Sequence, residues 1–257
     1  MFVPEVTHIF IYPFKSLDGI AVQDAVLLEN GALQHDRRFA LIDDDGNYIN
    51  GKRNPRVHLI RASFNLENEI ISLSAAGFSP ESFEFNDPQL LTYFCDFFEQ
   101  NVSIQENKIA GFPDDTSAPG FTLASTPSLV KMKTWFPELS LENLRRRFRH
   151  NIEISAPYSF WEDSLLGESE LESRFHIGEN AFLATGACSR CVVPTRDPET
   201  AELYPRFQKE FSLQREMDIH AETALSHFKH FYKFSINTKS LMLKSNRIQL
   251  GESVTKS

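Results

Sequence analysis

The first hundred residues constrain the fold most, because short apolar runs alternate there with turn-forming residues. Runs of this kind occupy residues 6–14, 38–50, 57–75 and 82–86. The second run contains Asp45-Gly46, and this pair supplies the positive φ that a tight hairpin turn needs. Short strands at this spacing, with no long helices between them, favour an antiparallel barrel or sandwich.

Two segments depart from the strand pattern. Residues 87–101 carry apolar positions at helical spacing, which predicts an amphipathic helix. Residues 125–139 are also predicted to be helical, because Ser125 or Thr126 can cap a helix and Pro127 suits its first turn. The fold class is therefore predicted to be mainly β with a few helices, an α+β fold.

A second strand-rich region follows these helices. Its predicted elements are strands at residues 147–155, 174–186 and 191–195 and a closing β-hairpin at residues 243–254. Between the two regions, residues 111–120 are rich in Gly, Pro, Asp and Ser, as expected of a domain junction or a ligand loop. The sequence thus predicts an N-terminal domain over residues 1–110 and a C-terminal domain over residues 111–257.

Charge and cysteine content exclude several classes of protein. A net charge of -9 argues against nucleic acid and anionic membranes as partners. Three cysteines are too few for a disulfide scaffold or a four-cysteine iron–sulfur cluster, and they suit a reducing compartment. No signal peptide or membrane-spanning apolar run is apparent. We therefore expect a cytoplasmic protein.

The most informative motif is GACSRCVVPTRDPET, residues 186–200, which places Cys188 and Cys191 on either side of Ser189 and Arg190. Zinc would need further ligands, and none of the candidates has paired spacing: Cys95, His176 and His220. A redox pair of the thioredoxin type would open a helix, whereas VVPT predicts strand and turn. Two ordinary reduced thiols remain the other alternative. Arg190 would favour the metal-binding thiolate of Cys191 by lowering its pKa.

Basic residues cluster in several places within this acidic chain. The clusters are Lys15 with Ser16, Arg37 with Arg38, Lys52 with Arg53 and Arg56, and Arg145, Arg146, Arg147 and Arg149 followed by Asn151. Each cluster alone is typical of a solvated surface. Several lie at predicted strand ends, where loops gather at one rim, and Arg, Lys and hydroxyl groups are the donors that hold phosphate. A thiolate among such donors indicates a ligand that is both anionic and thiophilic.

These motifs together resemble those of the MOSC-domain proteins. YPFKSLDGI and HDRRFALID are similar to the signature of the family's N-terminal β-barrel domain. RFRHNIEI, WEDS, IGENAF and CSRCVVPTRDPET resemble the core of the MOSC domain, in the same order. The resemblance implies a β-barrel-like N-terminal domain packed on a MOSC β-barrel. Within the family, the chain is most similar to the mitochondrial amidoxime-reducing component and its bacterial counterparts.

The resemblance also implies a cofactor and its site. The cofactor is the molybdenum cofactor (molybdenum-molybdopterin), with Cys191 as the metal ligand and catalytic residue. The implied cofactor contacts are Lys15, Ser16, Arg37, Arg38, Thr116, Ser117, Arg149, Asn151, Ser189 and Arg190. Arg37 and Arg38 exchange roles if the alignment shifts by one residue, and Asp115 opens the loop that contains Thr116 and Ser117. Pyridoxal phosphate binding is a further possibility at the level of the family.

The implied activity is reduction of a small N-hydroxylated substrate, with electrons from a separate reductase, ferredoxin-like or cytochrome-like protein. Asp163 and Asp197 are candidates for proton transfer or for orienting an arginine, although a structural role is the simpler interpretation of each. Two other functions stay open. One is a molybdenum cofactor or sulfur carrier without turnover. The other is a module that binds RNA or single-stranded DNA, against which the net charge argues.

Overall fold

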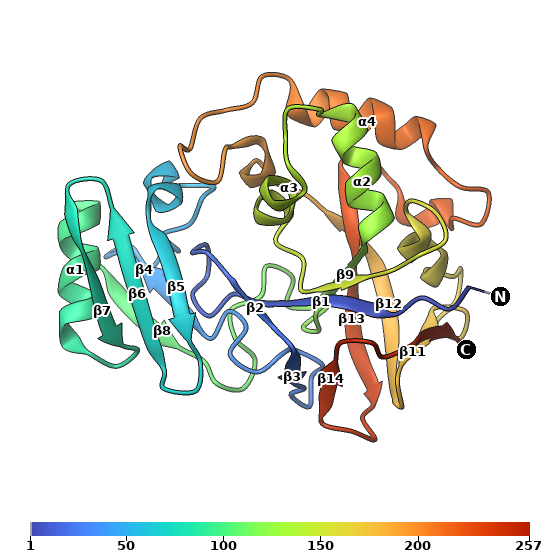
Figure 1. The fold of residues 1–257 in the computed structure, drawn as a ribbon, viewed down its shortest axis with the longest axis horizontal. Helices are drawn as coiled ribbons and strands as arrows, with labels where there is room; N and C mark the ends of the chain where they lie inside the picture. Colours follow the sequence, from blue (N-terminus) through green and yellow to red (C-terminus); the bar gives the residue numbers. More distant parts are fainter. Residues whose placement is uncertain (1) are drawn as a thin grey trace.

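The computed structural model describes residues 2–257, and Figure 1 shows a larger and a smaller lobe. The larger lobe is built on a mixed sheet in the order β15-β11-β12-β13-β9-β10-β1-β2. Its strands are β1 (Val6–Ile11), β2 (Ile20–Val22), β9 (Thr122–Ser125), β10 (Ile152–Ile154), β11 (Arg174–Ile177), β12 (Asn180–Ser189), β13 (Lys233–Met242) and β15 (Val254–Lys256). β9 and β10 run parallel, and the other neighbours in this sheet run antiparallel.

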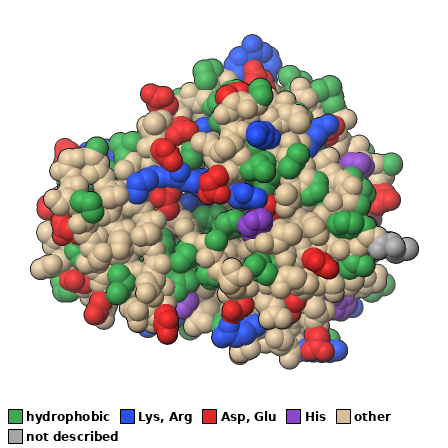
Figure 2. Space-filling view, in the orientation of Figure 1, with side chains coloured by type: hydrophobic (Ala, Val, Ile, Leu, Met, Phe, Trp, Pro, Cys, Tyr) green, Lys and Arg blue, Asp and Glu red, His purple; other side chains and the backbone are tan. Residues whose placement is uncertain are grey.

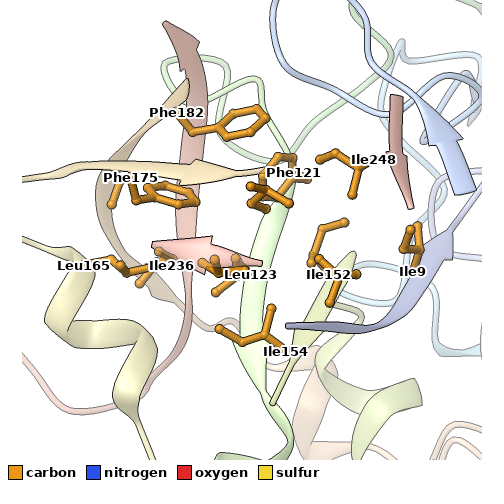
Figure 3. Packing of buried hydrophobic residues seen from close by; sticks show 14 of the residues in the cluster. Ile9, Phe121, Leu123, Ile152, Ile154, Leu165, Phe175, Phe182, Ile236 and Ile248 are labelled. Carbon is orange, nitrogen blue, oxygen red and sulfur yellow. The ribbon is translucent and has the colours of Figure 1, made fainter. Parts of the chain in front are cut away.

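One apolar cluster covers a face of this sheet. Figure 3 shows Ile9, Leu123 and Ile152, from three adjacent strands, directed toward Phe121 and Ile248. Ile248 lies on β14 (Arg247–Gln249), which pairs with β3 (Asp24–Val26) in a separate two-stranded sheet. Burying such side chains contributes roughly 1.5–3 kcal/mol each, so this cluster is a major source of stability for the larger lobe.

Three helices form a second cluster in the larger lobe. They are α2 (Thr126–Trp135), α3 (Leu141–Phe148) and α4 (Phe207–Met217). With neighbouring residues they form a largely aromatic cluster, in which the Phe136 ring stacks on Phe207 with centroids 4.4 Å apart. Short 3-10 helices connect the remaining parts of this lobe: η2 (Trp161–Leu165), η3 (Val193–Thr195) and η4 (Leu225–His227).

The smaller lobe has its own phenylalanine-rich core. It contains a three-stranded sheet of β5 (Arg61–Asn65), β6 (Ile70–Ala75) and β7 (Phe78–Glu84), a pair of β4 (Phe39–Ile42) with β8 (Ser103–Glu106), η1 (Pro55–Leu59) and α1 (Pro88–Phe98). The Asp87 side chain caps α1 by accepting a hydrogen bond from Gln89 N at 2.8 Å. The apolar face of α1, including Leu90 and Phe94, is buried in this core.

Most predictions of secondary structure are confirmed. The fold is mainly β with helices, and both predicted helices form, as α1 and α2. Gly46 has φ of +77° and its N–H donates to Asp43 O, as expected of the hairpin turn. Within residues 2–257, the strands of the largest sheet follow one another in a line, with β15 and β2 at its two ends.

Three local predictions are wrong. Residues 193–195 form η3 rather than a strand, because Thr195 N donates back to Val192 O at 3.0 Å. Residues 147–148 belong to α3, which ends in a left-handed residue, Arg149. The predicted closing hairpin does not form, because β14 pairs with β3 while β15 pairs with β11.

The division of the chain at residue 110 stays a prediction. β1 and β2 come from the first 22 residues and pair within the sheet of the larger lobe. The core of the smaller lobe draws on residues 14–102. No helix in residues 2–257 combines the length and apolar character that crossing a membrane requires.

Candidate functional site

A cavity of about 620 Å³ lies between the two lobes. Most of its wall comes from four parts of the chain: residues 15–61, the loop at 110–120, the end of α3 with residues 149–151, and residues 185–198. Thr122 on β9 and Asn237 on β13 complete it. Figure 2 shows Lys and Arg side chains, with Asp and Glu among them, gathered across the middle of this face of the molecule.

The structure brings together almost all of the residues predicted for the site. The predicted residues that line the cavity are Lys15, Ser16, Arg37, Thr116, Ser117, Arg149, Asn151, Ser189, Arg190 and Cys191. Residues more than 170 positions apart in sequence thus share one wall. Arg38 is not among the lining residues.

Arg37 and Arg38 point in different directions. Arg37 Nη1 donates to Asn151 Oδ1 at 3.2 Å and its guanidinium also pairs with Asp36. Arg38 instead binds Glu69 and donates from Nε to Glu106 Oε1 at 2.7 Å. Of the two arginines, only Arg37 lines the cavity, as expected if the alignment is shifted by one residue.

Arg149 enters the cavity because of how α3 ends. Ser140 caps the start of this helix, and Arg149 terminates it with φ of +52°. Its guanidinium lies 4.2 Å from the ring centroid of Tyr12, a cation–π contact, and donates to Leu17 O at 2.5 Å. Burial lowers the pKa of Arg149, and burial raises the pKa of Tyr12 to about 12.

Asn151 lines the cavity but its hydrogen bonds are already used within the protein. Its Oδ1 accepts from Arg37 and from Thr122 N at 3.1 Å, and its Nδ2 donates to Phe10 O at 3.2 Å. Asn151 is 1% exposed, and its hydrogen bond with Arg37 holds that guanidinium in place.

Cys191 follows the end of β12, in the turn that leads into η3. Val193 N donates to Cys191 Sγ at 3.4 Å, which fixes the thiol at the cavity wall. The thiol is half-buried. Arg190 Nη1 contacts the other thiol, Cys188 Sγ, at 3.2 Å, and its Nη2 bonds the carbonyl of Phe148. The contact between Arg190 and Cys191 expected from their adjacency is therefore replaced by one with Cys188.

The cavity lining is strongly basic for an acidic chain. It contains eight basic side chains and four acidic ones, an excess of four positive charges. Within residues 2–257, no carboxylate pairs with three of these basic side chains: Lys52, Arg149 and Arg190. Clustered cations without counter-charges favour an anionic ligand.

Lys15 and the neighbouring loop close one side of the cavity. Lys15 is 8% exposed, and its Nζ donates to Asp114 Oδ1 at 2.6 Å and to Phe112 O at 2.9 Å. Burial lowers the pKa of Lys15, and Asp114 opposes this shift. Ser117 donates to Asp115 Oδ1 at 2.6 Å, so the exposed loop is held by its own hydrogen bonds.

The two candidate proton carriers have structural contacts. Asp163 is 3% exposed and forms a buried ion pair with Arg215. Asp197 accepts from Glu199 N at 2.9 Å and from Thr200 N at 3.1 Å, a turn-capping role. Neither carboxylate lines the cavity. No group of three or more His, Cys, Asp or Glu side chains suited to metal binding occurs in the described chain.

Several lining residues were missed from the sequence: Asp18, Asp36, His58, Arg61 and Asp114. Asp18 and Asp36 belong to the motifs YPFKSLDGI and HDRRFALID, so the motifs themselves carried a signal for them. His58, the single histidine of PRVHL, carries no such signal, because most isolated histidines in apolar segments are structural.

Comparison with known proteins gives matches along both halves of the chain. Residues 3–115 match the family described as MOSC N-terminal beta barrel domain, and residues 121–255 match the MOSC domain. Mitochondrial amidoxime reducing component 2 of Rattus norvegicus is 25% identical over 245 residues, which span 77% of this chain and 68% of the relative. Molybdenum cofactor sulfurase of Homo sapiens is 23% identical over 273 residues, 86% of this chain but 30% of the sulfurase. The crystal structure of the YUAD protein from Bacillus subtilis aligns with a TM-score of 0.40 at 10% identity, over 98% of this chain and 94% of that chain.

Proposed function

The chain belongs to the MOSC family, with a MOSC N-terminal domain ahead of a MOSC domain, and on this premise we propose that it is a molybdenum-cofactor-dependent oxidoreductase. Its reaction is the reduction of N-hydroxylated compounds, in which two electrons and two protons convert an N–OH group to N–H and water. The observation that supports this proposal most is the cavity, where a thiol and an excess of positive charge meet.

The residues present fit the chemistry of this cofactor. Three buried polar atoms of the cavity wall have no hydrogen-bond partner within residues 2–257: His58 Nε2, Thr185 Oγ1 and Arg190 Nε. Orphaned buried polar groups are costly, so several in one wall favour a polar ligand there. The unpaired cations suit a phosphate, and a soft thiolate suits a metal already held by sulfur.

Specific residues would hold the cofactor. Cys191 would ligate the metal, and Arg37, Lys52, Arg149 and Arg190 would offset the negative charge of the phosphate and dithiolene. The bound cofactor would supply the two-electron redox chemistry. The protein would position it, since Val193 N fixes the thiol and Asn151 fixes Arg37. Electrons would come from a separate donor protein, and the substrate is a small molecule.

A second function is favoured by a specific comparison. Molybdenum cofactor sulfurase matches 86% of this chain, and the match covers only 30% of the sulfurase. A protein that carries the cofactor, or a persulfide on Cys191, without turnover would use the same cavity. A cytoplasmic location and a pyridoxal phosphate site both stay predictions.

Metal analysis of two cysteine variants tests the ligand assignment. Wild type, Cys191→Ala and Cys188→Ala are expressed with cofactor biosynthesis intact, and molybdenum per chain is measured by mass spectrometry. We expect wild type and Cys188→Ala to retain molybdenum and Cys191→Ala to lose most of it, because Cys191 is the proposed ligand and Cys188 is not. Stoichiometric molybdenum in Cys191→Ala would contradict the assignment.

Reduction of a model amidoxime with an artificial electron donor separates the two functions. An oxidoreductase reduces the amidoxime with wild-type protein and fails to do so with Cys191→Ala. A carrier without turnover retains molybdenum in the wild type but gives no amine product.

A further inference from the structure

His58 lines the cavity but is not among the proposed cofactor contacts. It lies on η1 in the smaller lobe and is 9% exposed. Its Nε2 is buried without a hydrogen-bond partner in the described chain. A buried imidazole nitrogen without a partner costs free energy, roughly 1–3 kcal/mol, which a bound ligand can recover.

The packing around Gly51 brings His58 near Val193, in the segment that follows Cys191. A methyl group at Gly51 would lie 2.6 Å from His58 Nε2 and 3.1 Å from Val193 Cγ2. Val193 in turn donates its N–H to Cys191 Sγ at 3.4 Å. Gly51 therefore packs between the imidazole and the Val193 side chain, and the absence of a Cβ at position 51 leaves room for the imidazole. The imidazole and the thiol both line the cavity.

The charge state of His58 suits a neutral group rather than an anion. Burial lowers its pKa to about 4, and Arg149, Arg196 and Arg147 add to this shift while Asp197 opposes it. A neutral imidazole offers one donor and one acceptor nitrogen. An N-hydroxyl group also donates and accepts, so it complements the ring, whereas phosphate and dithiolene are better matched by the arginines.

We infer that His58 positions the substrate beside Cys191, through a hydrogen bond between the N-hydroxyl group and a ring nitrogen. This inference rests on the proposed reduction of N-hydroxylated compounds. It makes His58 a substrate-positioning residue of the cavity, distinct from the residues that hold the cofactor.

The test compares three variants of the cofactor-loaded protein. His58→Phe keeps an aromatic ring and removes both nitrogens, His58→Asn keeps a hydrogen-bonding group, and His176→Phe alters a histidine on β11 outside the cavity. Molybdenum per chain is measured by mass spectrometry. The affinity for a model amidoxime is measured by calorimetry on oxidised protein without an electron donor. Nitrogen-15 histidine spectra of the wild type are recorded with and without the amidoxime.

We expect all variants to retain molybdenum. His58→Phe should bind the amidoxime about two- to tenfold more weakly, the range for loss of one hydrogen bond. His58→Asn should fall between His58→Phe and wild type, and His176→Phe should match wild type. The His58 nitrogen resonance, identified by its loss in His58→Asn, should shift when the amidoxime is added to wild type.

Two outcomes would overturn the inference while leaving the proposed function intact. One is unchanged amidoxime affinity in His58→Phe with no shift of the His58 resonance. The other is loss of molybdenum in His58→Phe with unchanged affinity per loaded site, which would assign His58 to the cofactor. If wild type itself does not bind the amidoxime, the proposed function fails and the inference fails with it. Should His58→Phe not fold, the resonance shift in wild type decides alone.

Discussion

At the scale of single residues, Arg149 best illustrates the unpaired positive charge of the cavity wall. Its guanidinium stacks on Tyr12 and bonds a backbone carbonyl, and no carboxylate in residues 2–257 pairs with it. Its depressed pKa reflects the cost of burying that charge. A bound phosphate would offset the cost, because charge-assisted hydrogen bonds to phosphate are stronger than neutral ones.

Replacement of Arg149 should therefore weaken cofactor retention. For Arg149→Met we expect cofactor binding about 10- to 100-fold weaker, the range for loss of one hydrogen bond to a charged group. Molybdenum content after dialysis is the measurement. Arg38→Met is the matched control, because Arg38 binds Glu69 and Glu106 outside the cavity. Equal retention by both variants would mean that Arg149 does not contact the cofactor.

The sequence predicted the kinds of residue in the site better than their directions. The motifs identified the arginine pair, but which of the two faces the cavity depends on backbone geometry. His35 and Arg37 have φ of +69° and +49°, so this segment is not an extended strand and simple alternation of faces does not hold there. Residues 147–148, at the end of α3, were likewise predicted to be strand, because the sequence pattern does not show that the left-handed residue Arg149 ends a helix there.

At the scale of elements, predictions succeeded where local pattern decides and failed where distant pairing decides. The helices α1 and α2 carry apolar positions or caps within their own segments, so periodicity was sufficient. The last residues of the chain resemble a hairpin locally, yet β14 and β15 find partners in strands more than 75 residues away. Pairing of this kind depends on the whole fold, which no short segment encodes.

The junction of β9, α2 and η2 contains a buried carboxyl group that predicts a pH effect on stability. Glu162 Oε2 accepts from Ser125 Oγ at 2.7 Å and from Ser128 Oγ at 2.9 Å, with no exposed surface. Burial, with the negative charge of Asp163, raises the pKa of Glu162 to about 7. The folded state then binds a proton that the unfolded state releases near pH 4.5, so stability falls as pH rises from about 4.5 to 7.

Glu162→Gln should remove this pH dependence, because glutamine resembles the protonated acid. Relative to wild type, the variant should gain about 1–3 kcal/mol of unfolding free energy between pH 5 and pH 8. Urea unfolding at the two pH values measures the difference. Glu216→Gln, at an exposed position on α4, is the control. A difference that does not change with pH would show that Glu162 is ionised throughout.

At the scale of the whole molecule, the cavity depends on how the two lobes are positioned relative to each other, because both contribute to its wall. Arg61 on β5 of the smaller lobe donates to Pro198 O at 2.8 Å, in the segment that follows η3. It also contacts Asp18, and Arg146 on α3 shares both of these partners. This group of contacts ties the smaller lobe to the segment after the Cys191 turn. The resemblance to the family indicated two domains, but the ties between them depend on side-chain geometry that motifs do not describe.

Arg61→Met should loosen that segment without unfolding the smaller lobe. We expect backbone amides at Asp197 and Ala201, which bond within the turn, to exchange hydrogen roughly five- to tenfold faster, consistent with loss of about 1 kcal/mol of local stability. Hydrogen exchange with mass spectrometry measures this. Arg56→Met is the matched control, because Arg56 bonds Phe97 O and Glu99 within the smaller lobe. If both variants leave exchange near Asp197 unchanged, the contacts of Arg61 do not stabilise the turn. The position of the two lobes relative to each other must then depend on their apolar packing.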